Sequence, residues 1–372
     1  MAIFVKAVHG NAICARIWTL VGMLLLSRRS APIRFHPAPS SFREQHADRR
    51  VGVVLVLALS TCAATWGEAA SAQAFPSKPI RLVVPFPPGG TTDTMTRIIA
   101  SPLSELLGQP LIVENRPGAG GTLGTELAAK APADGYTIVL GTVSTLAIAP
   151  NFYSTLRYNP ATSFAPISLI SRVPYLIFVH PSVPARSLQG LIDLARSHPG
   201  QLNFGSPGEG TLPQIAGERF KAMTAVDLVH VPYKGDAAAM TDLVSGQIQI
   251  VFGTLGPYHQ YVRAGKLRVL AAASSQRHTE LPDVPTAAEA GLPGYEVAAW
   301  FGLLAPTGTP PDVINLLNAD VLKVLRSKDV GEALSRHGIN PSGSSPDQFS
   351  ALINEEITKW AHAAKTSAAR HD

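Results

Sequence analysis

Apolar runs that predict strands alternate with amphipathic stretches that predict helices from residue 79 onward. The run Ile80–Phe86 predicts a buried strand. The 3.6-residue spacing over Thr92–Leu107 predicts a helix that Gly108 should end and that Pro102 should kink or split. Further strands are predicted at 110–115 and 136–141, with a short helix over Thr122–Lys130 between them. This β–α–β–α–β order favours a doubly wound, parallel sheet.

A second series of strands and helices occupies residues 175–306. Its predicted strands are 175–180, 202–206, 226–233, 248–253 and 267–274. Its predicted helices are one capped by Ser187, one over Leu212–Met223, one capped by Asp236 and ended by Gly246, one at Pro257, and one started by a Thr286–Glu289 capping box. After residue 306 the predicted helices are Pro310–Leu325, Asp329–His337 and one from the Ser345 cap to about Lys365.

The first 74 residues have the pattern of a leader rather than of a folded domain. Arg49 and Arg50 precede an apolar run over Val51–Ala64, and Ala72-Gln73-Ala74 fits a cleavage site, which is the layout of a secretory signal peptide. The apolar run is shorter than the roughly 20 residues that a membrane span needs. Residues 1–48 hold another short apolar run, so we favour a misplaced start over an unusually long leader. We expect an exported chain that begins near Phe75.

Removal of this leader would change the charge and the cysteine content of the chain. The sequence has 31 basic and 26 acidic residues, of which residues 1–74 hold eight and three, so that 23 of each remain. A balanced charge gives no reason to expect nucleic-acid binding. Both cysteines, Cys14 and Cys62, lie in the leader, so the mature chain would have neither a disulfide nor a thiolate metal site.

The segment Val83–Ala100 ends a strand in Pro87-Pro88-Gly89-Gly90 and opens a helix with two threonines and Asp93. The start of a helix leaves N–H groups without partners and carries partial positive charge, and glycine lets a ligand approach the backbone. Such a segment suits an anion, although it has neither the dinucleotide-binding nor the P-loop spacing. The alternative is an ordinary connection in which Thr92 or Asp93 only caps the helix.

Eight segments occur in the order typical of one family: "FPSKPIRLVVPFPPGGTTD", "VENRPGAGG", "PADGYTIVLGT", "GSPGEGT", "VPYKG", "AGKLRVLAAAS", "LPDVPTAAEAGLPGYE" and "WFGLLAPTGTP". From Phe75 to its C-terminus the chain resembles the extracytoplasmic solute-binding receptors of tripartite tricarboxylate transporters, the Bug or TctC-type proteins. The resemblance implies a type II periplasmic binding fold. In this fold two α/β lobes, each a doubly wound and mainly parallel sheet flanked by helices, are joined by strands that would cross near Tyr175–His180 and Glu296–Leu304.

The resemblance also implies a function and a division of the chain. Residues 75–176 and 301–372 would form one lobe and residues 177–300 the other, and the cleft between them would capture a small organic ligand, often a carboxylate, for membrane permease subunits. We expect a periplasmic monomer without a cofactor; the alternatives are a receptor for another transporter or for sensing alone. Three places depart from the family pattern, namely Gln214 instead of histidine, Ala149-Pro150-Asn151 instead of Asn-Pro, and Asp236-Ala-Ala where Ser and Pro are common.

Ligands of α/β lobes bind beyond the C-terminal ends of the strands, and here these ends are rich in glycine and hydroxyl residues, with Lys234 as their one basic side chain. We expect backbone N–H groups, helix dipoles and hydroxyls to hold an anion, so that the empty cleft buries no unpaired charge. Purely structural roles remain open for several of these residues. Gly89 and Gly90 could serve only as turn residues, and Phe86 and Trp300 could belong to the core. Ser206, Thr211, Asp93 and Asp236 could serve only as helix caps. The predicted ligand-binding residues are Phe86, Pro88, Gly89, Gly90, Thr91, Asp93, Ser144, Thr145, Ser206, Gly208, Gly210, Thr211, Gln214, Lys234, Gly235, Asp236 and Thr254.

The sequence does not favour an enzyme. "FGSPGEG" lacks the first glycine of G-x-S-x-G, because Phe204 stands there. The eight histidines after residue 74 show no metal-ligand spacing such as H-x-x-x-H. We therefore expect no catalytic and no metal-ligating residue. The contrasting hypothesis, a hydrolase that uses Ser206, requires a histidine or carboxylate within hydrogen-bond reach of that hydroxyl.

Overall fold

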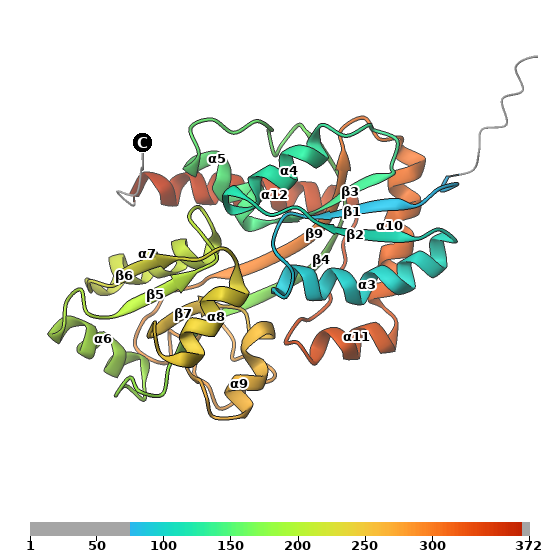
Figure 1. Ribbon diagram of the computed structural model, residues 1–372. Helices are drawn as coiled ribbons and strands as arrows, with labels where there is room; N and C mark the ends of the chain where they lie inside the picture. Colours follow the sequence, from blue (N-terminus) through green and yellow to red (C-terminus); the bar gives the residue numbers. More distant parts are fainter. Residues whose placement is uncertain (1–74, 367–372) are drawn as a thin grey trace, which may run out of the picture. The chain divides into compact units, whose positions relative to one another are not determined.

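The computed structural model describes residues 75–366, with side chains up to residue 361, and these residues belong to one compact unit (Figure 1). The predicted signal peptide, its cleavage site and the suspected misplaced start all fall in residues 1–74 and lie outside the described residues. Within residues 75–366, no helix combines the length and the apolar content that a membrane span requires.

The first sheet has the strand order β2-β1-β3-β9-β4. Strand β1 (Ile80–Val84) pairs in parallel with β2 (Leu111–Asn115) and β3 (Thr137–Thr142), as the alternating pattern predicts. Strands β9 (Ala298–Pro306) and β4 (Phe164–Val179) extend this sheet in antiparallel pairing. The accompanying helical segments are α3 (Thr91–Leu107), η1 (Ala119–Gly121), α4 (Thr122–Ala129), η2 (Ser144–Ile148), α5 (Ala149–Phe152), α10 (Pro311–Leu325), α11 (Lys328–Ser335) and α12 (Pro346–Thr366).

The second sheet is built on the other end of β4. From Tyr175 to Val179 this strand pairs antiparallel with β7 (Ile250–Gly253) and β8 (Arg268–Ala273). Strand β5 (Asn203–Ser206) lies parallel to both β7 and β6 (Val229–Pro232). Its helical segments are α6 (Leu188–Ser197), α7 (Leu212–Thr224), α8 (Asp236–Ser245), η3 (Gly256–Tyr258) and α9 (His259–Arg263).

Two strands connect the lobes (Figure 1). Strand β4 leaves β9 after Pro174 and joins β7 and β8 from Tyr175 onward. The second connection lies at Val297, whose N–H donates to Ala273 O at 2.9 Å in the second sheet, and β9 begins one residue later. The two-lobed α/β fold is thereby confirmed. Each sheet is mixed, because β9 runs antiparallel to β3 in the first sheet and β4 runs antiparallel to β7 in the second. The residue bounds of the lobes stay predictions.

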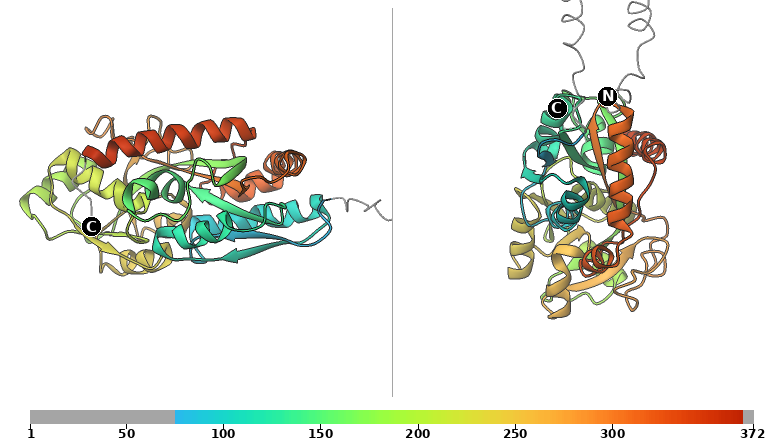
Figure 2. Two further views of the ribbon diagram at one scale, coloured as in Figure 1. Left: turned by 90° about the horizontal axis from the view of Figure 1, so that it is seen from above. Right: turned by 90° about the vertical axis from the view of Figure 1, so that its right-hand side faces the viewer.

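Trp300 belongs to the core and not to the cleft. Its side chain is fully buried and meets the ring of Phe349 in α12 edge-on, with 5.6 Å between ring centroids. Figure 2 shows α12, in red, along one side of the unit, where it contacts β4, α5 and η2. A smaller apolar cluster includes Phe178 of β4 and Tyr258 of η3, whose ring centroids are 4.6 Å apart. This second contact fixes an aromatic side chain close to the junction of the lobes.

Two expected helix features differ in the structure. Helix α3 is not split at Pro102, because Ile99, Leu103 and Leu107 on its buried face hold it against the sheet, and the alternative of a kink at Pro102 stays a prediction. The capping-box hydrogen bonds of Thr286 and Glu289 do form, at 2.8 and 3.1 Å, but they close only a turn. This turn does not continue into a helix, because Gly291 has a φ of 94° and a proline comes two residues later.

Candidate ligand-binding site

A cavity of about 60 Å³ lies at the junction of the lobes, which is room for several water molecules. Residues of both sheets and their helices line it. These residues are Phe86, Thr91, Thr92, Thr142, Val143, Ser144, Tyr175, Pro207, Thr211, Leu212, Pro213, Asp236, Gly253, Thr254, Pro257, Tyr258, Ala299 and Phe301. None of these lining residues is a lysine, an arginine or a histidine.

Helix starts surround this cavity. Thr91 and Thr92 are the first residues of α3, Leu212 is the first of α7, and Asp236 is the first of α8. The first N–H groups of a helix lack partners within it and carry the positive end of its dipole, so these three starts favour an anion without a cationic side chain among the described residues that line the cavity. Hydroxyl groups on five threonines, Ser144 and two tyrosines supply further donors.

The glycine N–H groups that the sequence suggested as anion donors are used within their own loops. Gly89 N–H donates to Asp93 Oδ2 at 3.1 Å, and Gly208 N–H donates to Ser206 Oγ at 3.2 Å. Gly210 N–H donates to the Gln214 side chain at 2.7 Å. In this structure nearby side chains satisfy these three groups, so ligand binding by the glycine N–H groups stays a prediction, and the residues of the first turn of α3 that line the cavity are Thr91 and Thr92.

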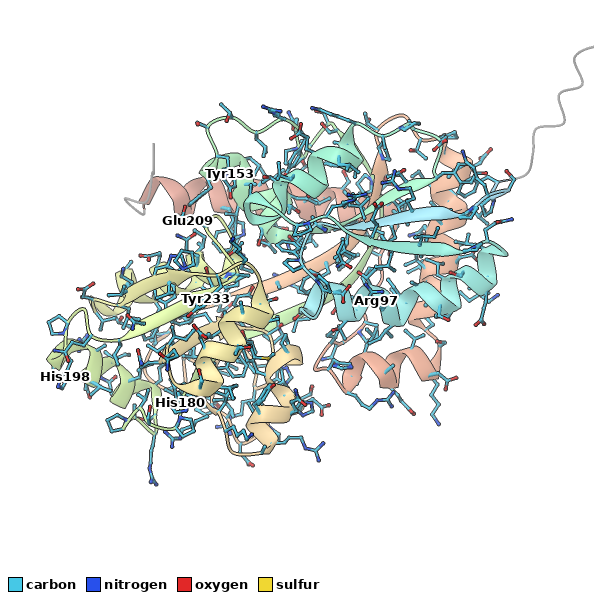
Figure 3. The ribbon with its side chains drawn as sticks, viewed as in Figure 1. Arg97, Tyr153, His180, His198, Glu209 and Tyr233 are labelled. Carbon is cyan, nitrogen blue, oxygen red and sulfur yellow. The ribbon has the colours of Figure 1, made fainter. Side chains whose placement is uncertain are left out.

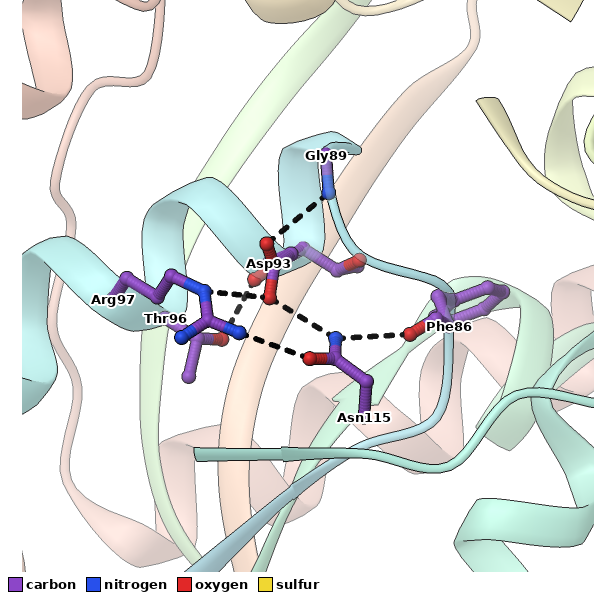
Figure 4. A network of polar contacts seen from close by, with 7 residues as sticks. Phe86, Gly89, Asp93, Thr96, Arg97 and Asn115 are labelled. Atoms are coloured by element: carbon purple, nitrogen blue, oxygen red, sulfur yellow. Dashed lines mark hydrogen bonds and ion pairs between the residues drawn. The ribbon is translucent and has the colours of Figure 1, made fainter. Parts of the chain in front are cut away.

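Asp93 neither caps α3 nor lines the cavity, since Gly90 is the N-cap. Figure 4 shows its carboxylate among Gly89 N–H, the Arg97 guanidinium at 3.0 Å and the Asn115 amide at 3.0 Å. Asn115 also donates to Phe86 O at 3.1 Å. Burial alone would raise the pKa of Asp93, but the hydrogen bonds from Arg97, Asn115 and Gly89 outweigh it and lower this pKa. The network fixes the loop that carries Phe86 into the cavity wall.

Hydrogen bonds join the lobes around the cavity. Thr91 Oγ1 and Thr254 Oγ1 are 2.8 Å apart, and Leu212 N–H donates to Ser144 Oγ at 3.0 Å. At the rim, the Tyr153 hydroxyl donates to Glu209 O at 3.1 Å, and Figure 3 labels these two residues next to each other. The cavity is therefore completed only when both lobes meet.

Three of the lining side chains are ionisable. Burial raises the pKa of Tyr175 and of Tyr258 well above the ordinary value, so both hydroxyls stay neutral and can donate. Burial also raises the pKa of the Asp236 carboxyl, from 3.8 to about 6. Asp236 is the first residue of α8, behind the N-cap Gly235, so the expected role of Asp236 as the cap is wrong.

The predicted site residues divide into two groups. Six line the cavity: Phe86, Thr91, Ser144, Thr211, Asp236 and Thr254. The others lie around it: Lys234 is exposed, Thr145 is fully buried and bonded to Thr142, and Gly90 and Gly235 are helix N-caps. The remaining ones that do not line it are Pro88, Gly89, Asp93, Ser206, Gly208, Gly210 and Gln214.

Sequence reasoning missed most of the apolar and aromatic wall. Tyr175, Ala299 and Phe301 lie on the connecting strands, and Pro257 and Tyr258 belong to η3. The predicted strand ends point to the open edge of each sheet, whereas these residues face the cavity only because β4 and β9 cross between the lobes. One sequence signal could have found them, namely the predicted position of the crossing strands, because strands that cross between two lobes form the base of the cleft.

Ser206 and His230 meet the first condition for a hydrolase, because Ser206 Oγ lies 2.7 Å from His230 Nε2. Other observations weigh against that function. The serine is 1% exposed, does not line the cavity, and also bonds Gly208 O at 3.0 Å. Burial lowers the pKa of His230 to about 4, and no carboxylate of the described residues bonds its ring. The pair shapes the loop before α7.

Across residues 75–361 no three His, Cys, Asp or Glu side chains are placed to hold a metal ion.

Two lobes, crossing strands and a cavity made by both define a binding protein of the two-lobed periplasmic type. The family model described as "Tripartite tricarboxylate transporter family receptor" (TctC) matches residues 95–367, and the chain belongs to this family. A curated relative, the protein BugT of Bordetella pertussis, is 38% identical over 310 residues, covering 82% of this chain and 95% of the relative.

Solved structures agree with this assignment. A protein of R. palustris solved with adipate shares 40% sequence identity and a TM-score of 0.77, covering 79% of this chain and 98% of its own. MatC from Rhodopseudomonas palustris, solved with bound malate, shares 35% identity and a TM-score of 0.75, covering 78% of this chain and 100% of its own. These relatives show that carboxylates bind to this fold.

Proposed function

We propose that the chain is an extracytoplasmic receptor that captures a small carboxylate between its lobes and delivers it to the permease subunits of a tripartite tricarboxylate transporter. The observation that carries the proposal is the cavity itself, which both lobes line and which combines three helix starts with a ring of hydroxyls. Charge-assisted hydrogen bonds from such donors are the strong kind, so a carboxylate gains most there. The carboxylates bound by the R. palustris relatives support the same ligand class.

The same proposal includes export of the chain to the periplasm and a binding role without catalysis. The family is one of receptors, and its structural neighbours are periplasmic binding proteins, so we assign this chain to the periplasm, with a mature start at Phe75. Sequencing the N-terminus of the exported protein tests the processing. A cytoplasmic chain that keeps residues before Arg49 would contradict it.

The bound molecule can be identified directly. The protein is purified from the periplasm of an expression host, denatured, and the released small molecules are identified by mass spectrometry; we expect a carboxylate. Calorimetric titration of the identified molecule then compares two variants. Ser144→Ala should weaken binding roughly 10- to 100-fold, since a hydrogen bond to a charged group contributes about 1.5–3 kcal/mol. Lys234→Ala, at an exposed site outside the cavity, should change affinity less than about twofold.

The reverse pattern would contradict the proposal. If Lys234→Ala loses binding while Ser144→Ala keeps it, neutral donors do not hold the ligand. An ester or amide substrate turned over by the wild type, with the turnover lost in Ser206→Ala, would instead support the hydrolase.

A further inference from the structure

Among the described residues, Asp236 is the one charged side chain that lines the cavity. Its position is set by the start of α8, which Gly235 reaches with a φ of 116°, a conformation that favours glycine. A carboxylate oxygen of Asp236 approaches Gly90 of the other lobe so closely that a methyl group on Gly90 would lie 2.8 Å from it. The negative charge also acts on Tyr175 and Tyr258, and contributes to their raised pKa values.

This carboxylate has no partner in the part of the chain that the structure describes. Within residues 75–361 no hydrogen bond reaches it, no cap contact forms at its own helix, and no cation lines the cavity with it. An aspartate in the first turn of a helix is favourable by itself. That preference explains the residue type, but it does not explain why a half-buried carboxylate without a side-chain or backbone partner is placed at the wall of a small cavity between the lobes.

The cavity thus has two chemically different parts. Around Ser144 and the start of α7, the lining offers neutral donors. The hydrogen bond from Leu212 N–H to Ser144 Oγ shows that these two groups are in contact. Asp236 instead belongs with Gly90, Tyr175 and Tyr258 and offers an anionic acceptor. A ligand that satisfies both parts must carry a carboxylate and a hydrogen-bond donor, and a positively charged donor gains most from the unpaired anion.

We propose that Asp236 selects an amino carboxylate, whose ammonium group pairs with Asp236 while hydroxyls and the start of α7 hold its carboxylate. This inference rests on the proposed receptor function and narrows its ligand class. A dicarboxylate such as adipate or malate would bring a second negative charge toward Asp236, and like charges in a desolvated site repel strongly. The ligand class of this receptor would therefore differ from that of the two R. palustris relatives.

Matched pairs of compounds test this selection. β-Alanine and malonate, 4-aminobutyrate and succinate, and 6-aminohexanoate and adipate differ only in the group at one end. We would titrate each compound by calorimetry at pH 8 into the wild type, Asp236→Asn and Asp242→Asn. The last variant is the matched control, since Asp242 lies on the same helix but bonds the Tyr233 hydroxyl, outside the cavity. Thermal unfolding would verify that each variant folds.

We expect the wild type and Asp242→Asn to bind at least one amino compound about tenfold or more tightly than its dicarboxylate partner. In Asp236→Asn this preference should fall by about tenfold or reverse, because the amino compound loses its counter-charge and the dicarboxylate loses a repulsion. An unchanged ratio in Asp236→Asn would overturn the inference, even if both compounds bind more weakly. Such a result would assign Asp236 to lobe contact alone.

The mass-spectrometric experiment separates this inference from the function on which it rests. A released dicarboxylate, or wild-type protein that binds dicarboxylates as tightly as amino acids, would overturn only the selection by Asp236. A released ligand without any carboxylate, together with no binding by all six compounds, would overturn the carboxylate receptor as well. A released amino carboxylate supports both.

Discussion

At the scale of single residues, Asp93 acts as an organiser of the loop before α3. Replacement of Asp93 by alanine removes the acceptor for Gly89 N–H, Asn115 and Arg97 together. Since Asp93 is 5% exposed but Arg97 is half-exposed, we expect a loss of about 2 kcal/mol in the free energy of unfolding, measured by urea denaturation. Glu332→Ala, which removes only the exposed ion pair with Lys328, should cost no more than about 0.5 kcal/mol.

The effect of Asp93→Ala should depend on pH. The folded-state pKa of Asp93 is below its ordinary value of 3.8, so its contribution is complete above that pH and is lost as the pH falls through the folded-state pKa. The difference between the wild type and Asp93→Ala should therefore shrink below about pH 4. An equal difference at pH 3 and pH 7 would show that the ionised carboxylate is not what stabilises this loop.

The pH dependence of stability that Asp236 causes should have the opposite sign to that of Asp93. Its folded-state pKa, about 6, is above its ordinary value of 3.8, so the folded protein holds this proton more tightly. Stability is therefore lost as the pH rises from about 4 to about 6, and the whole cost persists above pH 6. We expect Asp236→Asn, which also gives up a favourable charge at the helix start, to stabilise the ligand-free protein at pH 8 by about 1–2 kcal/mol, and by much less at pH 4, in urea unfolding. Destabilisation at pH 8 would mean that this carboxylate has a favourable partner.

At the scale of elements, the caps that the sequence indicates can be tested one at a time. Ser187 Oγ accepts a hydrogen bond from Gly190 N–H at 3.1 Å at the start of α6, as its sequence position predicts. Ser187→Ala should lower the free energy of unfolding by about 1 kcal/mol, whereas Ser187→Gly should lower it by only a few tenths. Equal losses for the two variants, measured by chemical denaturation, would mean that backbone entropy and not the cap dominates.

Local signals predicted most elements but could not decide how far each one extends. Ser345 and Gln348 exchange capping hydrogen bonds at 3.2 and 3.0 Å and start the 21-residue helix α12. Thr286 and Glu289 make the same pair of bonds and start only a turn. The difference lies in the residues after each cap, because Gly291 and Pro293 end the second segment while a long amphipathic pattern continues the first.

The residues of the site, like the elements, were predictable from the sequence only in part. Hydroxyl residues at helix starts, such as Thr91, Ser144 and Thr211, were predictable because strand ends and helix starts are visible in the sequence. The use of the glycine N–H groups was not, since it depends on how Asp93 and Gln214 fold back onto their own loops. The aromatic wall was hidden for a different reason, as it forms only where two distant strands cross.

At the scale of the whole molecule, the contacts between the lobes imply a hinge at the crossing strands. Binding proteins with this architecture close by rotation of their lobes. We expect the radius of gyration in small-angle scattering to fall when the compound that binds best in calorimetry is added. Tyr153→Phe, which removes the rim hydrogen bond to Glu209, should leave the liganded form more open than in the wild type. A profile that does not change on ligand addition would contradict the hinge.

The absence of lysine, arginine and histidine from the described residues of the cavity wall has a kinetic consequence. With 23 basic and 23 acidic residues after residue 74, and no cationic side chain among the described residues that line the site, the protein has no strong field to draw an anion in from a distance. Encounter then depends on diffusion, and ionic strength should alter its rate little. Discrimination between ligands then depends on the residence time of the bound molecule, which is set by how long the two lobes stay closed around it.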